Sequence, residues 1–312
     1  MTPHTDRILP GVALMLAFCL IAPLIDVASK LASATVPVGQ ITTARFLVQV
    51  VLMLPILFVM GQGLRVSRRA LRLTLWRALA SIASTFTFVW AVSHMPLADA
   101  LAIAFVEPFI LLILGRLIFN DEVGPRRIGA SAVGFLGALM VIQPSFATFG
   151  WIALLPVGTA FAFAAYMLIT REASRAMTPE AMQFHTAWVA AAICLPVLVL
   201  ADGAGLEVLD TVMPQGLAWV WLAGVGVAAT VSHMFMTYAL KLAPSATLAP
   251  LHYLEIVSAA ALGYLVFGDF PNALTWAGIA VIVASGLYII HRERVMAAQA
   301  RQARPPAARA AG

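Results

Sequence analysis

The sequence predicts an all-α integral membrane protein with ten transmembrane helices, arranged as two inverted five-helix repeats. Composition gives the first indication: 62% of the 312 residues are hydrophobic, 11% are charged and the mean hydropathy is +0.95. A soluble domain of this length is less apolar and carries more charge. About 20 apolar residues cross a hydrocarbon core of about 30 Å, and long continuous runs favour helices over the alternating strands of a barrel.

Ten apolar segments of suitable length follow one another along the chain. We expect helices centred near Phe18, Val48, Thr85, Pro108, Gly134, Ala160, Ala191, Ala229, Val257 and Val281.

An internal repeat gives the second indication. Residues 77–142 recur as residues 225–290, and this shift of 148 positions places Glu107 on Glu255 and Asp121 on Asp269. The parallel phrases are LGRLIFNDEV and LGYLVFGDFP. Five helices are an odd number, so the second copy must enter the membrane in the opposite direction. We expect one repeat over 8–143, the other over 149–291, and a basic tail over 292–312.

The positions of arginine and lysine predict the orientation. If the N-terminus is cytoplasmic, fifteen basic residues face the cytoplasm, including Arg7, Arg68 and the tail, whereas only Lys30 faces the other side. This bias predicts that both termini are cytoplasmic. It also accounts for the pI of about 9.7, so we expect contact with membrane lipids and no nucleic-acid partner.

The repeats resemble a known family. Two five-helix copies, each with a phrase like LGxLxFxD before a last helix rich in glycine and alanine, are similar to EamA-type members of the drug/metabolite transporter superfamily. The resemblance implies a secondary transporter in the bacterial inner membrane, with a cavity lined by the first four helices of each repeat. Family members move very different solutes, so the cargo stays open.

Two acidic residues lie deep in apolar segments. Glu107 and Glu255 are each expected near the membrane midplane, where a charged side chain costs at least about 2.5 kcal/mol, so both should face the interior. We interpret them as cavity or proton-pathway residues; a structural hydrogen bond to a neighbouring helix is the alternative. Pro108 adds a prediction, because its missing N–H and its ring should bend the helix near Ala104.

Polar stripes accompany these acids. His252 lies three residues before Glu255, on the same helix face, and a His–Glu pair can relay a proton near neutral pH. On the eighth helix His233 belongs to a stripe that interhelical hydrogen bonding would explain equally well. The first repeat has a matching but weaker stripe, formed by Ser81, Ser84, Thr85 and Phe88.

Further candidates are one charged pair and several aromatic residues. Asp26 and Arg45 are expected at similar depth, and we hypothesise an ion pair that holds the outer vestibule or meets a charged group of the solute. Four aromatic residues could provide surfaces for a flat solute; packing in the bundle or anchoring at the membrane interface is the alternative. These are Trp90, Phe105, Tyr238 and Tyr253.

The fifth and tenth helices are spaced with small residues, for example Ala130, Gly134 and Ala138, which allow close helix packing. We expect packing within the bundle; a homodimer contact is the alternative. Cys19 and Cys194 lie in apolar segments and indicate neither a disulfide nor a metal site.

We predict neither an enzyme nor a cofactor, because the sequence lacks HExxH, GxSxG, GxxxxGK[ST] and GxGxxG. The expected function is alternating-access transport of a small metabolite, driven by a gradient because no ATP-binding motif is present, with possible proton coupling. Export of amino acids or related metabolites is favoured, and import of a vitamin-like heterocycle such as riboflavin is the competing prediction. A membrane enzyme or scaffold is disfavoured, because the short loops hold no catalytic cluster.

Overall fold

The structure is a computed structural model that describes residues 8–62, 66–119, 125–173, 176–242 and 254–303. Each of the ten predicted helix centres lies inside a helix of this described part. The helices are α1 (Ile8–Ala32), α2 (Val38–Val59), α3 (Arg68–Val92), α4 (Leu97–Ala104), α5 (Glu107–Phe119), α6 (Pro125–Phe149), η1 (Gly150–Leu154), α7 (Leu155–Ala173), α8 (Pro179–Ala201), α9 (Ala218–Leu242), α11 (Leu254–Phe267) and α12 (Ala273–Ala303).

The helices confirm an all-helical, multi-pass membrane protein. Within the described residues, 6 helices are long and apolar enough to span a membrane, and shorter apolar helices include Glu255–Phe267 and Ala273–Ser285. Large apolar side chains such as Leu20, Val51 and Leu265 are exposed on the outside of the bundle. In a bilayer these side chains would contact lipid, so their exposure needs no further partner.

Helix ends follow local sequence signals. Ser67 precedes α3 and its side chain accepts a hydrogen bond from the backbone N–H of Ala70; Thr178 does the same for Ala181 at the start of α8. These side chains satisfy N–H groups that the first helical turn leaves without partners. They fix where α3 and α8 begin.

The fourth predicted helix is broken in two. Its first part, α4, ends at Ala104, and α5 begins at Glu107 with Pro108 as its second residue. Proline has no N–H to donate to the preceding turn, so the carbonyl near Ala104 loses its helical partner. The predicted bend near Ala104 is therefore confirmed, as an interruption of the helix.

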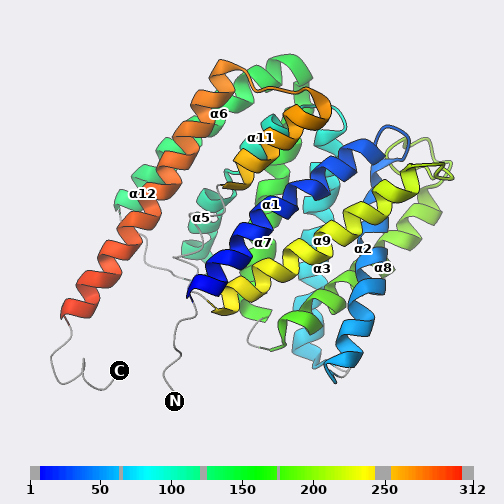
Figure 1. Cartoon of the computed structure of the whole chain (residues 1–312), viewed down its shortest axis with the longest axis horizontal. Coiled ribbons are helices and arrows are strands. Elements are labelled where there is room, and N and C mark those ends of the chain that lie inside the picture. The colour runs from blue at the N-terminus through cyan, green and yellow to red at the C-terminus, as the bar shows by residue number, and fades with distance from the viewer. Residues whose placement is uncertain (1–7, 63–65, 120–124, 174–175, 243–253, 304–312) are drawn as a thin grey trace.

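The two halves run in opposite directions. We call the face where α1 begins and α12 ends the tail side, and the opposite face the far side (Figure 1). The first repeat begins on the tail side with α1, whereas the second begins on the far side with α7. The arrangement follows from the odd number of helices in each repeat, as the sequence predicts.

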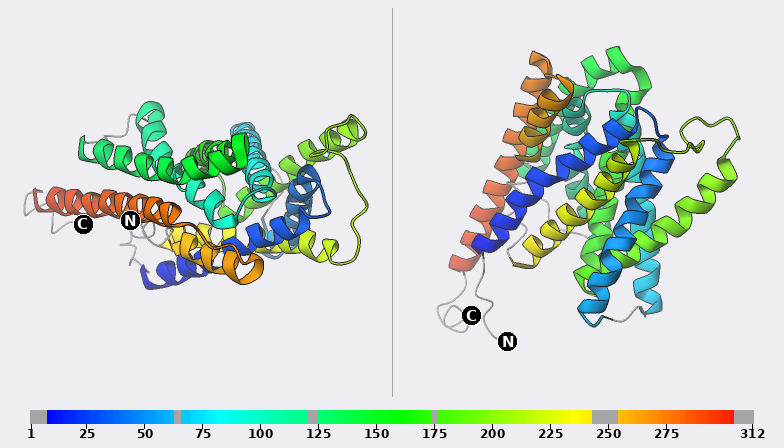
Figure 2. Two further views of the ribbon diagram at one scale, coloured as in Figure 1. Left: turned by 90° about the horizontal axis from the view of Figure 1, so that it is seen from above. Right: turned by 45° about the vertical axis from the view of Figure 1, so that its right-hand side comes forward.

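The main packing is between the repeats: α1 lies against α9, α2 against α8, α3 against α7 and α6 against α12 (Figure 2). Small residues allow the closest approach. A Cβ atom added at Gly278 of α12 would lie 2.7 Å from the backbone oxygen of Gly137 on α6. The prediction that small residues serve packing within the bundle is confirmed, and a homodimer contact stays a prediction.

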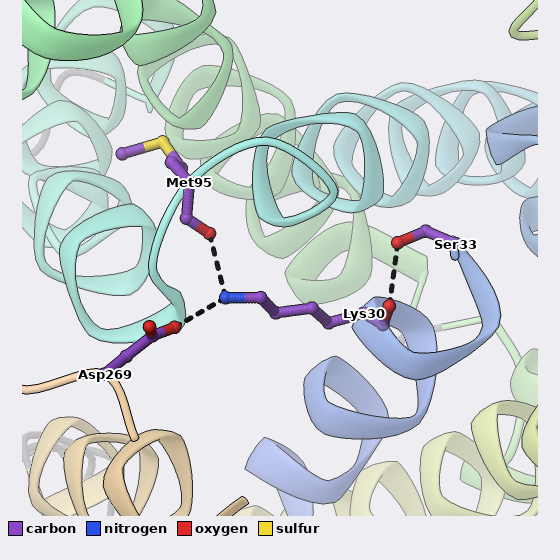
Figure 3. Close-up of polar contacts among 4 residues, drawn as sticks. All are labelled: Lys30, Ser33, Met95 and Asp269. Atoms are coloured by element: carbon purple, nitrogen blue, oxygen red, sulfur yellow. Dashed lines mark hydrogen bonds and ion pairs between the residues drawn. The ribbon is translucent and has the colours of Figure 1, made fainter. Parts of the chain in front are cut away.

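One ion pair joins the repeats on the far side (Figure 3). Lys30, near the end of α1, donates to Asp269 Oδ2 at 2.7 Å and to the backbone oxygen of Met95 at 3.3 Å. Its ammonium nitrogen also lies 4.6 Å from the centre of the Phe267 ring. Lys30 therefore joins α1 to the segment before α4 and to the segment after α11.

Candidate functional site

A cavity of about 150 Å³ lies between the two repeats. Both halves line it, through α1 to α5 of the first repeat and α7, α9 and α11 of the second. Most lining positions fall between the middle of their helices and the far side. The residues used below are Phe18, Asp26, Arg45, Ser81, Ser84, Thr85, Phe88, Phe105, Glu107, Phe163, Tyr166, His233 and Glu255.

The two repeated glutamates both line this cavity. Glu107 is the first residue of α5 and Glu255 the second residue of α11, and their side chains are buried. The N-terminus of a helix carries partial positive charge, which stabilises a carboxylate placed there. The break between α4 and α5 thus places Glu107 in an environment suited to negative charge, and Glu255 lies in the first turn of the described part of α11.

Asp26 and Arg45 both line the cavity, but they do not form the hypothesised ion pair with each other. The ion pairs found among the described residues are Lys30–Asp269 and Arg69–Glu172. Arg45 instead donates from Nη1 to the Thr85 hydroxyl, while its Nε is buried without a hydrogen-bond partner. A vestibule held by direct Asp26–Arg45 contact is therefore not the arrangement of this conformation.

The weaker of the two predicted polar stripes faces the cavity more fully. Ser81, Ser84, Thr85 and Phe88 on α3 all line it. On α9, His233 lines the cavity, with its Nδ1 2.8 Å from the backbone oxygen of Ala229 and its ring 6.4 Å from that of Phe18.

Two predicted aromatic residues lie elsewhere, and two candidates fall outside the described residues. Trp90 packs edge-on against Trp151 at 5.1 Å, and Tyr238 donates to Glu180; neither lines the cavity. Phe105 does line it. His252 and Tyr253 lie in the segment 243–253, which the structure does not describe.

The cavity also contains aromatic residues that sequence reasoning missed. Phe163 and Tyr166 on α7 line it, with ring centres 5.6 Å apart and ring planes 14° apart. Their spacing of three places them on one helix face. That spacing was the available signal, but it does not show which face of a largely apolar helix meets the interior.

Polar contacts among α2, α8 and α9 lie on the tail side of the cavity. Gln49 on α2 donates to Gln183 on α8 at 3.1 Å, and Gln183 donates to Thr237 on α9 at 3.4 Å. These contacts lie among buried side chains, where such hydrogen bonds fix helix positions. The first bond joins the two repeats and the second joins α8 to α9 within the second repeat. The cavity itself lies in the middle and the far-side half.

This arrangement provides charged groups, hydroxyls and rings around a small interior space, as a binding site for a small solute requires. Within the described ranges, no group of three or more histidine, cysteine, aspartate or glutamate side chains could hold a metal ion. Binding and proton exchange are the chemistry that the lining residues can support.

Similarity to known proteins agrees with the fold. A solved crystal structure superposes with a TM-score of 0.67 at 15% sequence identity, covering 92% of this chain and 98% of that chain. At this identity the likeness shows the fold alone.

Among characterised proteins, the chain is 29% identical to a riboflavin transporter of Rhizobium johnstonii over 70% of this chain and 71% of that protein. It is 27% identical to a pseudopaline exporter of Pseudomonas aeruginosa, over 90% and 95% respectively. The model of the EamA-like transporter family matches residues 9–143 and again residues 150–291. The two matches cover nearly the whole chain, and the protein belongs to the EamA-like transporter family, a family of transporters rather than enzymes.

Proposed function

We propose that this protein is a secondary-active transporter that moves a small charged metabolite, an amino acid or a related compound, by alternating access. In this proposal it exports its solute across the bacterial inner membrane, with both termini in the cytoplasm, and protons drive transport through Glu107 and Glu255. The cavity is built within one chain, so the mechanism does not require a homodimer.

The observation that carries the proposal is the placement of Glu107 and Glu255. One acid from each inverted repeat lines the same cavity, so a rocking motion of the repeats would change the surroundings of both. An acid buried in a membrane can bind a proton on one side and release it on the other. The bias of basic residues toward the tail side supports a cytoplasmic tail side.

The size and charge of the cavity support a small solute. Its volume of about 150 Å³ is below the roughly 300–1,000 Å³ typical of sites for drug-sized ligands. Arg45 could meet a carboxylate, and Asp26, Glu107 or Glu255 an ammonium group. An amino acid offers both groups within a small volume.

A second candidate is import of a vitamin-like heterocycle such as riboflavin. It is favoured by the similarity to the Rhizobium johnstonii riboflavin transporter and by the rings in the lining, including Phe105 and Phe163. Such a solute would need a wider cavity than this conformation holds.

Transport in proteoliposomes tests the proposal. Purified protein is given a mixture of the common amino acids and riboflavin under an imposed pH gradient, and each compound is measured by mass spectrometry on both sides. We expect gradient-dependent movement of at least one amino acid and loss of that dependence in Glu255→Gln and Glu107→Gln.

Glu207→Gln is the matched control, because Glu207 is exposed in the loop after α8 and does not line this cavity. Transport that is independent of pH, together with full activity of both cavity variants, would rule out proton coupling. Movement of riboflavin alone would favour the second candidate, and the direction of the driving gradient distinguishes export from import.

A further inference from the structure

Arg77 is a buried charge that the proposed transport cycle does not use. Its side chain is 2% exposed. It lies nine residues into α3, roughly 13 Å along the helix from the tail-side end. At this depth the Arg77 guanidinium is too far from the lipid headgroups to be fully solvated by them and by water. Its charge therefore needs partners inside the bundle.

Those partners are neutral groups on α7 and α8. Nε donates to the Thr170 hydroxyl at 2.8 Å, Nη1 to the backbone oxygen of Met182 at 3.1 Å and to the Thr186 hydroxyl, and Nη2 to the Tyr166 hydroxyl. The ion pairs of the described part of the chain do not include Arg77. The planar guanidinium is thus held in one orientation by several directional bonds.

The threonine hydroxyls keep hydrogen bonds of their own. Thr170 donates to the backbone oxygen of Tyr166 at 2.7 Å, and Thr186 donates to that of Met182 at 2.7 Å. Removing the guanidinium would leave these two hydroxyls bonded within their own helices. Among the side chains that Arg77 contacts, Tyr166 therefore depends on it most.

Tyr166 contacts Arg77 in two ways and continues into the cavity wall. Besides the hydroxyl bond, the guanidinium carbon lies 4.3 Å from the centre of the Tyr166 ring. The Tyr166 ring stacks almost parallel on Phe163, which is half-buried and lines the cavity. A cation held against a ring away from water is a strong contact of its kind.

We propose that Arg77 is a positioning residue that fixes Phe163 and Tyr166 as a flat aromatic wall, and that this wall selects solutes carrying a planar ring. The inference rests on the proposed transport function and names the solute class that this cavity prefers. Phe18, Phe88 and Phe105 line the same cavity. They would contact the parts of the solute's ring that Phe163 and Tyr166 leave uncovered.

An arginine suits this role better than an apolar residue. Apolar side chains would pack α3 against α7 and α8 at lower cost, because a buried charge must be desolvated. They would not bond the Tyr166 hydroxyl or restrain the plane of its ring. The guanidinium does both, and so limits rotation of the ring that supports Phe163.

The test measures selectivity, using the mixture in proteoliposomes described above. Phenylalanine, tyrosine, tryptophan and riboflavin are its ring-bearing members, and leucine, isoleucine and methionine its aliphatic members. We expect the wild type to prefer ring-bearing members. In Arg77→Met and Phe163→Leu that preference should fall about three- to tenfold, the size of a stacking contact, while aliphatic transport is retained.

Tyr166→Phe separates the two contacts, because it removes the hydroxyl and keeps the ring; we expect a smaller loss of preference than in Arg77→Met. Arg77→Lys keeps the charge but not the planar fork, and should rank between Arg77→Met and the wild type. Arg69→Met is the matched control, since Arg69 lies on the same helix with its side chain 67% exposed and should leave the preference unchanged.

Several outcomes would overturn the inference. One is a wild type that moves aliphatic members as well as ring-bearing ones, which would leave the proposed transport function standing. Another is an Arg77→Met variant that loses all members equally together with its thermal stability, which would make Arg77 a purely structural residue. If the wild type showed no gradient-dependent transport of any compound in the mixture, both the inference and the proposed function would be overturned.

Discussion

At the scale of single residues, the sequence predicts how deep a charged side chain lies in the membrane but not which residue it contacts. Glu107, Glu255, Asp26 and Arg45, which the sequence places deep in apolar segments, all line one cavity; their roles stay predictions. Their partners could not be predicted, because contacts between distant helices depend on helix rotation. Arg45 contacts Thr85 rather than Asp26, for example.

The Lys30–Asp269 pair should stabilise the contact between the repeats. The two side chains are only 19% and 28% exposed, so their attraction is less screened than that of a surface pair. We expect Lys30→Ala and Asp269→Ala each to lower the melting temperature in detergent. The double variant should show a coupling of about 1 kcal/mol. The same comparison of single and double variants at the more exposed Arg69–Glu172 pair should give a smaller coupling energy. Equal coupling energies at the two pairs would contradict this expectation.

A loop acid outside the membrane gives a pH-dependent prediction. Hydrogen bonds from the Thr211 backbone N–H and hydroxyl lower the pKa of Asp202. A pKa lower in the folded than in the unfolded state adds stability above the unfolded pKa, and that stability is lost as pH falls through the folded value. Wild type should therefore melt above Asp202→Ala at pH 7, and the difference should shrink below about pH 4. A difference that is constant with pH would contradict this.

The residues missed by sequence reasoning share a physical cause. Phe163 and Tyr166 lie on an apolar helix, and membrane helices carry apolar side chains toward lipid as well as toward the interior. Hydrophobic periodicity therefore cannot show which side of α7 meets the cavity. For the same reason, Trp90 and Tyr238 were plausible cavity residues but lie elsewhere.

At the scale of helices, the boundaries follow from sequence more closely than the packing. Every predicted helix centre lies in a helix, and the proline after Glu107 predicted a bend at the place where α4 and α5 are separated. The consequence of that interruption could not be predicted. The glutamate lies at the start of a new helix, where the helix dipole stabilises its charge, rather than in mid-helix.

Close packing of α6 on α12 gives a prediction at this scale. A Cβ at Gly278 would lie 2.6 Å from Val141 Cγ2 and 2.7 Å from a backbone oxygen, so Gly278→Ala must push the helices apart. We expect a loss of about 1–3 kcal/mol, measured as a lower unfolding temperature in detergent. Gly129→Ala on α6 is the control, because nothing lies within 4 Å of its added Cβ. Equal effects of the two changes would show that α6 and α12 do not limit each other's approach.

At the scale of the whole molecule, the inverted repeat was predictable because it depends only on counting helices and aligning the two copies. The structure adds that the four main helix pairs, α1–α9, α2–α8, α3–α7 and α6–α12, all cross the boundary between repeats, so relative motion of the repeats changes the cavity between them. In this conformation the cavity extends from the middle toward the far side, and the hydrogen bonds of Gln183 with Gln49 and Thr237 lie on its tail side. The central claim is that this cavity opens to one side at a time.

Thiol labelling of one cavity position tests that claim most directly. Ser84 lines the cavity, and both native cysteines are buried, so Ser84→Cys is placed in a chain whose Cys19 and Cys194 are replaced by alanine. A membrane-impermeant maleimide is applied to oriented vesicles from either side. We predict labelling from the far side at rest and from the tail side only when transport is driven by solute and a pH gradient. Labelling from a single side under all conditions would contradict alternating access.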